Sequence, residues 1–243
     1  MPGTRITYSA EGVEFICTLF TPAGSGPAPG VLVAHEFPGL SGHTYEAAER
    51  LAGLGFVALA VDYQGGGEFV ADREEMMRRL GWFMEDPGHI RARLGAALET
   101  LKAQPRVDAG RLAAIGYCYG GTAVLEAARG GADLKAVVGF HSGLGTTRPA
   151  QAGVVRARIL TCIGFHDPII PADQRLAFET EMDAAGVDWR MNVYGGAGHS
   201  FTNPNVGALG MPGFEYDEAT DRRSWAAMLD FFDEVLGPVT AAA

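Results

Sequence analysis

The strongest structural signal in this chain is the hexapeptide GYCYGG, at residues 116–121. It follows the short apolar run 112–115, which favours a strand, and precedes segment 122–129, which favours a helix. A turn that joins strand to helix so abruptly needs glycines on both sides, because a Cβ there would clash. The pattern is that of a nucleophile elbow with Cys118 at its tip. The helix dipole would favour the thiolate of Cys118, and the N–H of Tyr119 would remain free to bind an oxyanion.

The same Gly-x-Cys-x-Gly pattern also occurs in ordinary glycine-rich turns that contain an inert cysteine. The rest of the chain therefore has to distinguish the two interpretations. The three cysteines are too few and too scattered for a disulfide framework or a zinc site. Cys17 and Cys162 lie in apolar, strand-like runs and are expected to pack inside the sheet. Only Cys118 has surroundings that would activate a thiol.

Length and charge restrict the classes of function. The 243 residues suffice for a full hydrophobic core, and strands and helices alternate from end to end, so one domain over residues 1–243 is expected. The formal net charge of −10, without a basic cluster, argues against nucleic acid or an anionic membrane as a partner. No apolar run approaches the about 20 residues of a membrane span, and residues 1–6 lack the apolar core of a signal peptide. We therefore expect a cytoplasmic monomer or small homo-oligomer that acts on a small molecule.

Apolar runs and amphipathic segments alternate along the whole chain. Short continuous apolar runs are typical of strands covered on both faces, and apolar residues spaced three or four apart are typical of helices. This alternation predicts a mostly parallel sheet with helices on both sides, in which ligands bind beyond the carboxyl ends of the strands. The expected strands are a hairpin over 4–20, then 31–34, 56–61, 111–115, 135–140, 158–163 and, near the sheet edge, 188–194. The expected helices are 45–54, one within 69–86, 89–103, 122–129, 172–185 and 218–236, with a long Gly/Pro loop over 195–214.

If Cys118 is a nucleophile, an acid and then a histidine should follow it in the chain. Asp167 and His199 each lie in the loop after an expected strand, so both would reach the sheet edge at which Cys118 lies. His199 would take the thiol proton, and Asp167 would hold the imidazole in the right tautomer. Taken singly, Asp167 before a proline is often a simple turn, and His199 between glycine and serine is often a surface residue. His166 is a rival base, but it is adjacent to Asp167, and two adjacent residues cannot easily serve one nucleophile as base and orienting acid.

The loop HEFPG, at residues 35–39, follows the first buried strand. In enzymes with such an elbow the second oxyanion donor is a backbone N–H of this loop, here that of Phe37. Glu36 is unusual, because a carboxylate near a thiol opposes thiolate formation unless it accepts the thiol proton. Glu36 would then hold Cys118 protonated until substrate arrives. The alternative is that Glu36 is a solvated loop residue.

These residues resemble the dienelactone hydrolase (carboxymethylenebutenolidase) family of α/β-hydrolases. The resemblance spans essentially the whole chain and rests on the motifs HEFPGL (35–40), GYCYGG (116–121), HDP (166–168) and HSF (199–201). It implies an α/β-hydrolase fold and the hydrolysis of a lactone or ester through an acyl-enzyme, without a cofactor or a metal. The implied roles are Cys118, Asp167 and His199 as the catalytic triad, Glu36 as the residue that holds the resting cysteine, and the amides of Phe37 and Tyr119 as the oxyanion hole.

One departure from the family concerns the substrate. Members that act on dienelactone hold its carboxylate with arginines, one in the loop after the fourth strand and one shortly after the catalytic histidine. The corresponding segments here, DYQG at 62–65 and TNP at 202–204, contain no arginine. Arg148 is an alternative cation for binding substrate, although a lone arginine is more often a solvated surface residue. A neutral ester or another lactone is therefore nearly as plausible as dienelactone.

Two other classes of function remain open. A broad carboxylesterase for small neutral aryl or alkyl esters would favour open-chain esters over lactones. A thiol sensor or ligand-binding protein would keep the elbow without turnover, and a sensor is expected to pair Cys118 with a resolving cysteine. The expected burial of Cys17 and Cys162 argues against such a pair. The segment 202–214 is long enough to cover the site, but its conformation does not follow from the sequence.

Overall fold

The inner strands of the sheet form where the sequence is apolar without interruption. The computed structural model describes residues 3–239, so Met1, Pro2 and residues 240–243 of the expected 1–243 domain lie outside the described residues. The strands are β1 Thr4–Ala10, β2 Val13–Phe20, β3 Ala28–Ala34, β4 Val57–Val61, β5 Val107–Tyr117, β6 Ala136–Phe140, β7 Arg158–Gly164 and β8 Trp189–Tyr194.

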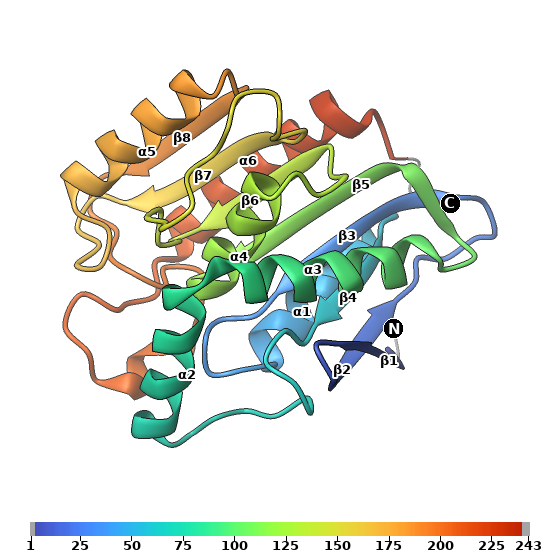
Figure 1. Ribbon diagram of the computed structural model, residues 1–243, viewed down its shortest axis with the longest axis horizontal. Coiled ribbons are helices and arrows are strands. Elements are labelled where there is room, and N and C mark those ends of the chain that lie inside the picture. The colour runs from blue at the N-terminus through green and yellow to red at the C-terminus, as the bar shows by residue number, and fades with distance from the viewer. Residues whose placement is uncertain (1–2, 240–243) are drawn as a thin grey trace.

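These strands form one eight-stranded sheet in the order β1-β2-β4-β3-β5-β6-β7-β8 (Figure 1). β1 pairs with β2, and β2 with β4, in antiparallel fashion, whereas all other neighbours are parallel. β3, β4 and β6 are buried along their whole length, as expected for strands covered on both faces. The mostly parallel sheet and the position of β8 at its edge are therefore confirmed.

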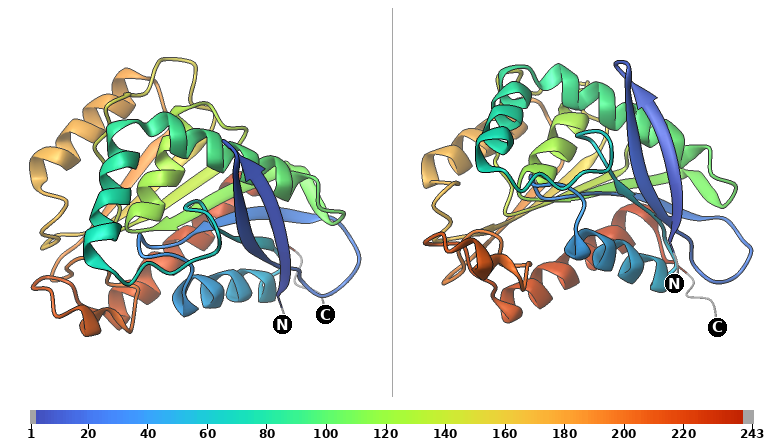
Figure 2. Two further views of the ribbon diagram at one scale, coloured as in Figure 1. Left: turned by 60° about the horizontal axis from the view of Figure 1, so that its bottom comes forward. Right: turned by 90° about the horizontal axis from the view of Figure 1, so that it is seen from below.

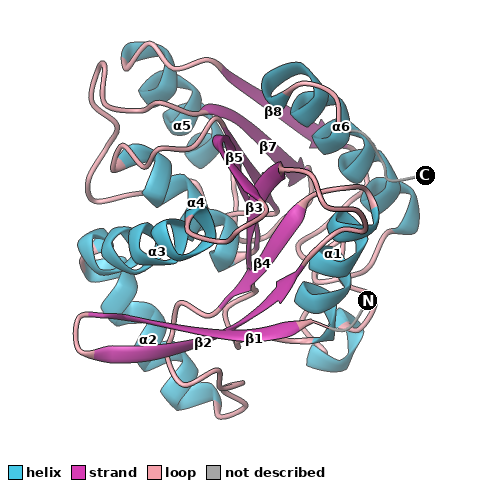
Figure 3. Ribbon diagram, turned by 90° about the vertical axis from the view of Figure 1, so that its right-hand side faces the viewer, coloured by secondary structure: helices cyan, strands magenta, loops and turns pink. Residues whose placement is uncertain are grey.

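Helices cover both faces of the sheet. They are α1 Gly42–Gly53, α2 Arg73–Glu85, α3 Pro87–Lys102, α4 Tyr119–Arg129, α5 Ala172–Ala184 and α6 Glu218–Leu236, with the short 3-10 helix η1 Val206–Leu209. α1 and α6 pack on one face of the sheet, and α2, α3, α4 and α5 on the other (Figures 2 and 3). Each face thus has its own hydrophobic core. Among the described residues, no helix is both long and apolar enough to cross a membrane.

Five elements begin two to four residues earlier than the sequence pattern predicts. α1 begins at Gly42 rather than at 45, and α3 at Pro87 rather than at 89. β3 begins at Ala28 rather than at 31, because Ala28 and Pro29 pair with the first residues of β5 before the register shifts after Pro29. β5 accordingly begins at Val107 rather than at 111. α4 begins at Tyr119 rather than at 122, because its first turn includes two glycines of the elbow, which a propensity pattern does not assign to a helix.

The carboxyl ends of the parallel strands meet at one end of the molecule. Cys118 follows β5 there, and Asp167 and His199 lie in the loops after β7 and β8. α2 and segment 195–217 border this end of the sheet (Figure 1). The topology therefore gathers residues that are far apart in the sequence at the place where such sheets bind ligands.

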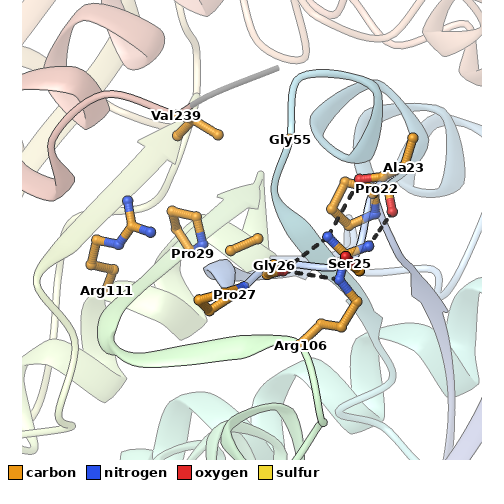
Figure 4. A pocket seen from close by; sticks show the side chains of 12 residues that line it. Pro22, Ala23, Ser25, Gly26, Pro27, Pro29, Gly55, Arg106, Arg111 and Val239 are labelled. Atoms are coloured by element: carbon orange, nitrogen blue, oxygen red, sulfur yellow. Dashed lines mark hydrogen bonds between the residues drawn. The ribbon is translucent and has the colours of Figure 1, made fainter. Parts of the chain in front are cut away.

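The opposite end of the sheet is closed by the Pro/Gly-rich segment 22–29. A cavity of about 200 Å³ lies beneath it, lined by this segment and by Arg106 and Arg111 (Figure 4). Arg106 donates hydrogen bonds to three carbonyl oxygens of the segment, those of Pro22, Ala23 and Gly26. Arg106 therefore anchors the segment against the amino ends of the strands.

Candidate active site

The elbow between β5 and α4 holds Cys118 in a strained backbone conformation. Its φ of 52° lies in the left-handed region, which residues other than glycine seldom adopt. A Cβ on Gly116 would lie 2.2 Å from the carbonyl oxygen of Gly120, and a Cβ on Gly120 would lie 2.3 Å from that of His35. Both glycines are thus required for the close approach of α4 to β5 and β3. The tight elbow expected from the sequence is confirmed.

The structure brings Cys118, His199 and Asp167 into one line of hydrogen bonds. His199 Nε2 lies 3.2 Å from Cys118 Sγ, and His199 Nδ1 lies 2.7 Å from Asp167 Oδ2. Asp167 Oδ1 accepts the N–H of Ile169 at 2.8 Å, which fixes the carboxylate in turn. The side chains of His199 and Asp167 are buried, whereas Cys118 is partly exposed. This arrangement can transfer a proton from the thiol to an imidazole whose second nitrogen is held by a carboxylate.

Electrostatics favour a charged His199. Burial alone would lower its pKa, but the negative charge of Cys118 and the hydrogen bond to Asp167 outweigh burial and raise the pKa to about 10. An imidazolium at His199 is therefore favoured at neutral pH. Its positive charge lies 3.2 Å from the sulfur of Cys118.

The rival base His166 does not reach the nucleophile. Its side chain is exposed, and its ring packs edge to face against Phe165, with centroids 5.1 Å apart. Of the two histidines, only His199 forms a hydrogen bond with Cys118.

Segment 195–217 holds the backbone of His199 from both sides. His199 N–H donates to the carbonyl oxygen of Gly213 at 2.7 Å, and its own carbonyl accepts from Glu215 N–H at 3.2 Å. The ring of Phe214 lies against the imidazole, with centroids 4.6 Å apart. The segment thus returns on itself and fixes the histidine, which the sequence did not reveal.

Two backbone N–H groups, one in the loop after β3 and one directly after Cys118 in the chain, are left unpaired in the described part of the chain. Those of Phe37 and Tyr119 have no hydrogen-bond partner within residues 3–239. The two rings pack edge to face, with centroids 5.3 Å apart, which brings the two loops together. Gln64 donates from its side-chain amide to the carbonyl oxygen of Phe37 and so fixes that peptide. This geometry is consistent with the expected oxyanion donors.

Glu36 is engaged away from the thiol in this structure. Its carboxylate accepts hydrogen bonds from Ser200 Oγ at 3.1 Å and from Asn203 Nδ2 at 2.5 Å. His43 Nδ1 lies 3.7 Å from the same carboxylate. No hydrogen bond joins Glu36 to Cys118 among the described residues. Glu36 is therefore a partly buried loop residue with internal partners, not the solvated glutamate of the alternative interpretation.

Arg148 is not brought to the other candidate residues. Its guanidinium pairs with Asp86 at 2.9 Å, and its side chain is about half exposed. None of its hydrogen bonds or ion pairs within the described residues involves Cys118, His199 or Asp167. Sequence reasoning placed Arg148 in a loop near the site, but the direction of a side chain in a loop follows from tertiary pairing rather than from local pattern.

Sequence reasoning also missed three residues that shape the site. Gln64 and Phe214 carried no signal, because their contacts depend on how distant loops meet. His141, at the end of β6, was not considered, although a positive φ of 41° and complete burial set it apart. Within residues 3–239 no group of three or more His, Cys, Asp and Glu side chains is arranged as metal ligands.

A mostly parallel sheet with a cysteine on a strand-to-helix elbow, followed in the chain by an aspartate and a histidine that face it, defines an α/β-hydrolase. Within that superfamily the model of the dienelactone hydrolase family matches residues 15–236, and the chain belongs to this family. The resemblance inferred from the motifs is thereby confirmed.

Relatives and solved structures agree with this assignment. The carboxymethylenebutenolidase of Pseudomonas knackmussii is 29% identical over 201 residues, 79% of this chain and 83% of the relative. A crystal structure of a dienelactone hydrolase-like promiscuous phosphotriesterase from metagenomic libraries is 39% identical, with a TM-score of 0.92 over 97% of this chain and 99% of that one. A structure named m3DLH is 44% identical, with the same TM-score of 0.92, and covers 97% of this chain and 98% of its own. The chain is thus a hydrolase of the ester and lactone type.

Proposed function

We propose that this hydrolase opens a lactone or ester through an acyl-enzyme on Cys118. The observation that carries the proposal is the continuous line of hydrogen bonds from Cys118 through His199 to Asp167, built on a strained elbow. The neighbouring N–H groups of Phe37 and Tyr119 support it, because they are free to hold an oxyanion. The proposed unit is one domain formed by the whole chain.

In the first half-reaction the thiolate of Cys118 attacks the substrate carbonyl carbon. The carbonyl oxygen becomes an oxyanion that accepts hydrogen bonds from the N–H groups of Phe37 and Tyr119. When the tetrahedral intermediate collapses, the C–O bond breaks and the imidazolium of His199 gives its proton to the leaving alkoxide. A thioester on Cys118 and a neutral His199 remain. In a lactone the released hydroxyl stays attached to the acyl group.

In the second half-reaction water replaces the alcohol. Neutral His199 takes a proton from water, and the hydroxide attacks the thioester carbonyl in the same oxyanion site. The C–S bond breaks, Cys118 leaves as a thiolate, and the acid product departs. Asp167 holds the imidazole with Nε2 toward the reacting atoms throughout both steps.

Glu36 is proposed to protect the resting enzyme. Its carboxylate would leave Ser200 and Asn203 and accept a hydrogen bond from the thiol of Cys118 when no substrate is bound, so that the sulfur keeps its proton. The position of Glu36 on the loop that also supplies the Phe37 N–H supports this role. The hydrogen bonds to Ser200 and Asn203 would then define the active arrangement, in which Cys118 faces His199.

A neutral, apolar ester is the second candidate substrate. The segments equivalent to the carboxylate-binding arginines contain none, and exposed apolar side chains lie on the segments that border the site. The similarity to a promiscuous phosphotriesterase adds neutral phosphotriesters as a class to be tested. These exposed apolar residues are Met77, Trp82 and Met84 of α2, Phe165 and Ile169 after β7, and Leu209 and Met211 in segment 195–217.

Steady-state hydrolysis tests both candidates. A carboxylate-bearing dienelactone and a neutral aryl ester are compared with wild-type enzyme, Cys118→Ala and, as a matched control, Cys162→Ala, which removes a buried thiol far from the elbow in the sequence. We expect Cys118→Ala to lose hydrolysis of every substrate while Cys162→Ala retains it. Full activity of Cys118→Ala would refute the proposed function. Preference for the lactone would assign the first substrate class and preference for the aryl ester the second, whereas wild-type inactivity on both would favour a non-catalytic role.

A further inference from the structure

His141 is a buried histidine that the proposed reaction does not use. It follows the last residue of β6, is fully buried, and has a φ of 41°, in the left-handed region. Its own N–H donates to the carbonyl oxygen of Cys162 in β7 at 2.8 Å. Its ring packs edge to face against those of His199 and Phe201, with centroids 5.2 and 5.1 Å away. A strained conformation of this kind persists only where the surroundings hold it, and it is typical of functional sites.

The two ring nitrogens of His141 have different partners, which fixes the tautomer. Nδ1 lies 3.1 Å from the backbone nitrogen of Cys118, whose N–H also reaches the carbonyl oxygen of Phe140 at 3.0 Å. A backbone N–H only donates, so Nδ1 is the acceptor and carries no proton. The proton is therefore on Nε2, which donates to Thr202 Oγ1 at 2.8 Å.

His141 remains uncharged beside the charged base. Burial lowers its pKa well below the usual value, and the neighbouring His199 and His43 lower it further. A neutral ring can accept the N–H of Cys118 at one nitrogen and donate at the other, whereas an imidazolium would lose the acceptor and repel His199. The bridge from Cys118 to Thr202 is therefore maintained in one protonation state.

This bridge joins the two parts of the chain that carry the reacting groups. Cys118 lies on the elbow between β5 and α4, and Thr202 lies three residues after His199 in the loop that follows β8. Thr202 is itself buried. From these contacts we infer that His141 is a positioning residue, which sets the separation between the Cys118 thiolate and His199 by linking the nucleophile's backbone to Thr202. The inference rests on the proposed function, because it assigns His141 to the same reaction.

Substitution of Thr202 gives the mildest test, because it removes one end of the bridge and leaves the elbow intact. Thr202→Val deletes the hydroxyl at nearly constant volume, and Thr202→Ser restores it. Thr161→Val is the matched control: Thr161 is fully buried in β7, and its hydroxyl has no partner among the described residues. His141→Asn is the variant at the other end, since asparagine tolerates a positive φ and keeps an acceptor for the N–H of Cys118 but cannot reach Thr202.

Three quantities are measured for each full-length variant: kcat and KM for a neutral aryl ester, the pH dependence of Cys118 alkylation by iodoacetamide, and unfolding by urea. We expect Thr202→Val and His141→Asn each to lower kcat by about ten- to a hundredfold with KM unchanged, the effect of a small displacement of reacting groups. The midpoint of the alkylation profile should move to higher pH, because the imidazolium stabilises the thiolate less well. Thr202→Ser should recover both properties, and Thr161→Val should change neither.

A double-mutant cycle completes the test. If His141 and Thr202 act through one bond, the combined variant should lose no more kcat than either single variant. Wild-type kcat and alkylation profile in Thr202→Val would overturn the inference. The inference would also be overturned if kcat fell only in proportion to the loss of stability in urea while the alkylation profile stayed unchanged. The same holds if Thr161→Val lowered kcat as much as Thr202→Val does. The proposed function fails separately, if Cys118→Ala retains hydrolysis.

Discussion

Replacing Asp167 by asparagine changes one atom and should remove most of the activity. Both carboxylate oxygens of Asp167 accept hydrogen bonds, one from His199 Nδ1 at 2.7 Å and one from Ile169 N–H at 2.8 Å. Asparagine has a single side-chain acceptor, which Ile169 N–H retains, so the amide NH₂ faces His199. Nδ1 must then accept a hydrogen bond, and the imidazole proton moves to Nε2, toward Cys118. His199 can no longer take a proton from the thiol.

The size of the effect follows from the step that is lost. General base catalysis by a positioned imidazole contributes roughly 10²–10⁴-fold, which corresponds to about 3–5 kcal/mol in the activation free energy. Loss of the charged partner should also lower the pKa of His199 from about 10, because the hydrogen bond to Asp167 is one of the interactions that raise it. The fold should persist, because the two side chains have nearly the same volume.

Burst kinetics measure the acylation step directly. Wild-type enzyme, Asp167→Asn and Asp173→Asn, an exposed carboxylate in the first turn of α5, are mixed with a p-nitrophenyl ester by stopped flow. The rate of the burst should fall by roughly 10²–10⁴-fold in Asp167→Asn and stay at the wild-type value in Asp173→Asn. NMR titration of His199 in the same variants checks the pKa. A wild-type burst rate in Asp167→Asn, or a His199 that still titrates near pH 10 in that variant, would refute the reasoning.

Three further substitutions test the scaffold and the substrate site. Arg129→Met leaves Glu126 and Glu181 without the buried arginine with which both pair. The free energy of unfolding, measured with urea, should fall by about 3–5 kcal/mol. An unchanged unfolding transition would mean that these ion pairs do not stabilise the fold. Asp62→Ala leaves four backbone N–H groups, one in β2 and three in the loop after β4, without their acceptor. The variant should lower the free energy of unfolding by about 3 kcal/mol or more in the same assay, and a smaller loss would show that water replaces the carboxylate. Arg148→Ala should leave the KM for a carboxylate-bearing lactone unchanged, because Arg148 is paired elsewhere; a raised KM would return it to the substrate site.

The parts of the structure that depend on local pattern could be predicted from the sequence. The elbow follows from the glycines around Cys118. The order of nucleophile, acid and base pointed to Asp167 and His199, and the adjacency of His166 to Asp167 argued against His166 as the base. The parallel sheet follows from uninterrupted apolar runs. Each of these features is encoded within a few residues.

The parts that depend on distant contacts could not be predicted. His141 contacts Cys118 and Thr202 only because β5, β6 and the loop after β8 end at the same edge of the sheet. Glu36 was expected beside the thiol, but Ser200 and Asn203 hold it in this structure, and neither contact leaves a trace in the sequence. The early start of β3 was missed because a strand pattern does not include a proline at a register shift.

The most direct test of the account is the intact mass of the enzyme after rapid acid quenching during turnover of p-nitrophenyl acetate. The account predicts that wild-type enzyme gains the mass of one acetyl group and that peptide mapping locates it on Cys118. Cys118→Ala should gain none, whereas Cys162→Ala should behave as wild type. An acetyl group on any other residue during turnover, or hydrolysis by Cys118→Ala at the wild-type rate, would contradict the acyl-enzyme on Cys118.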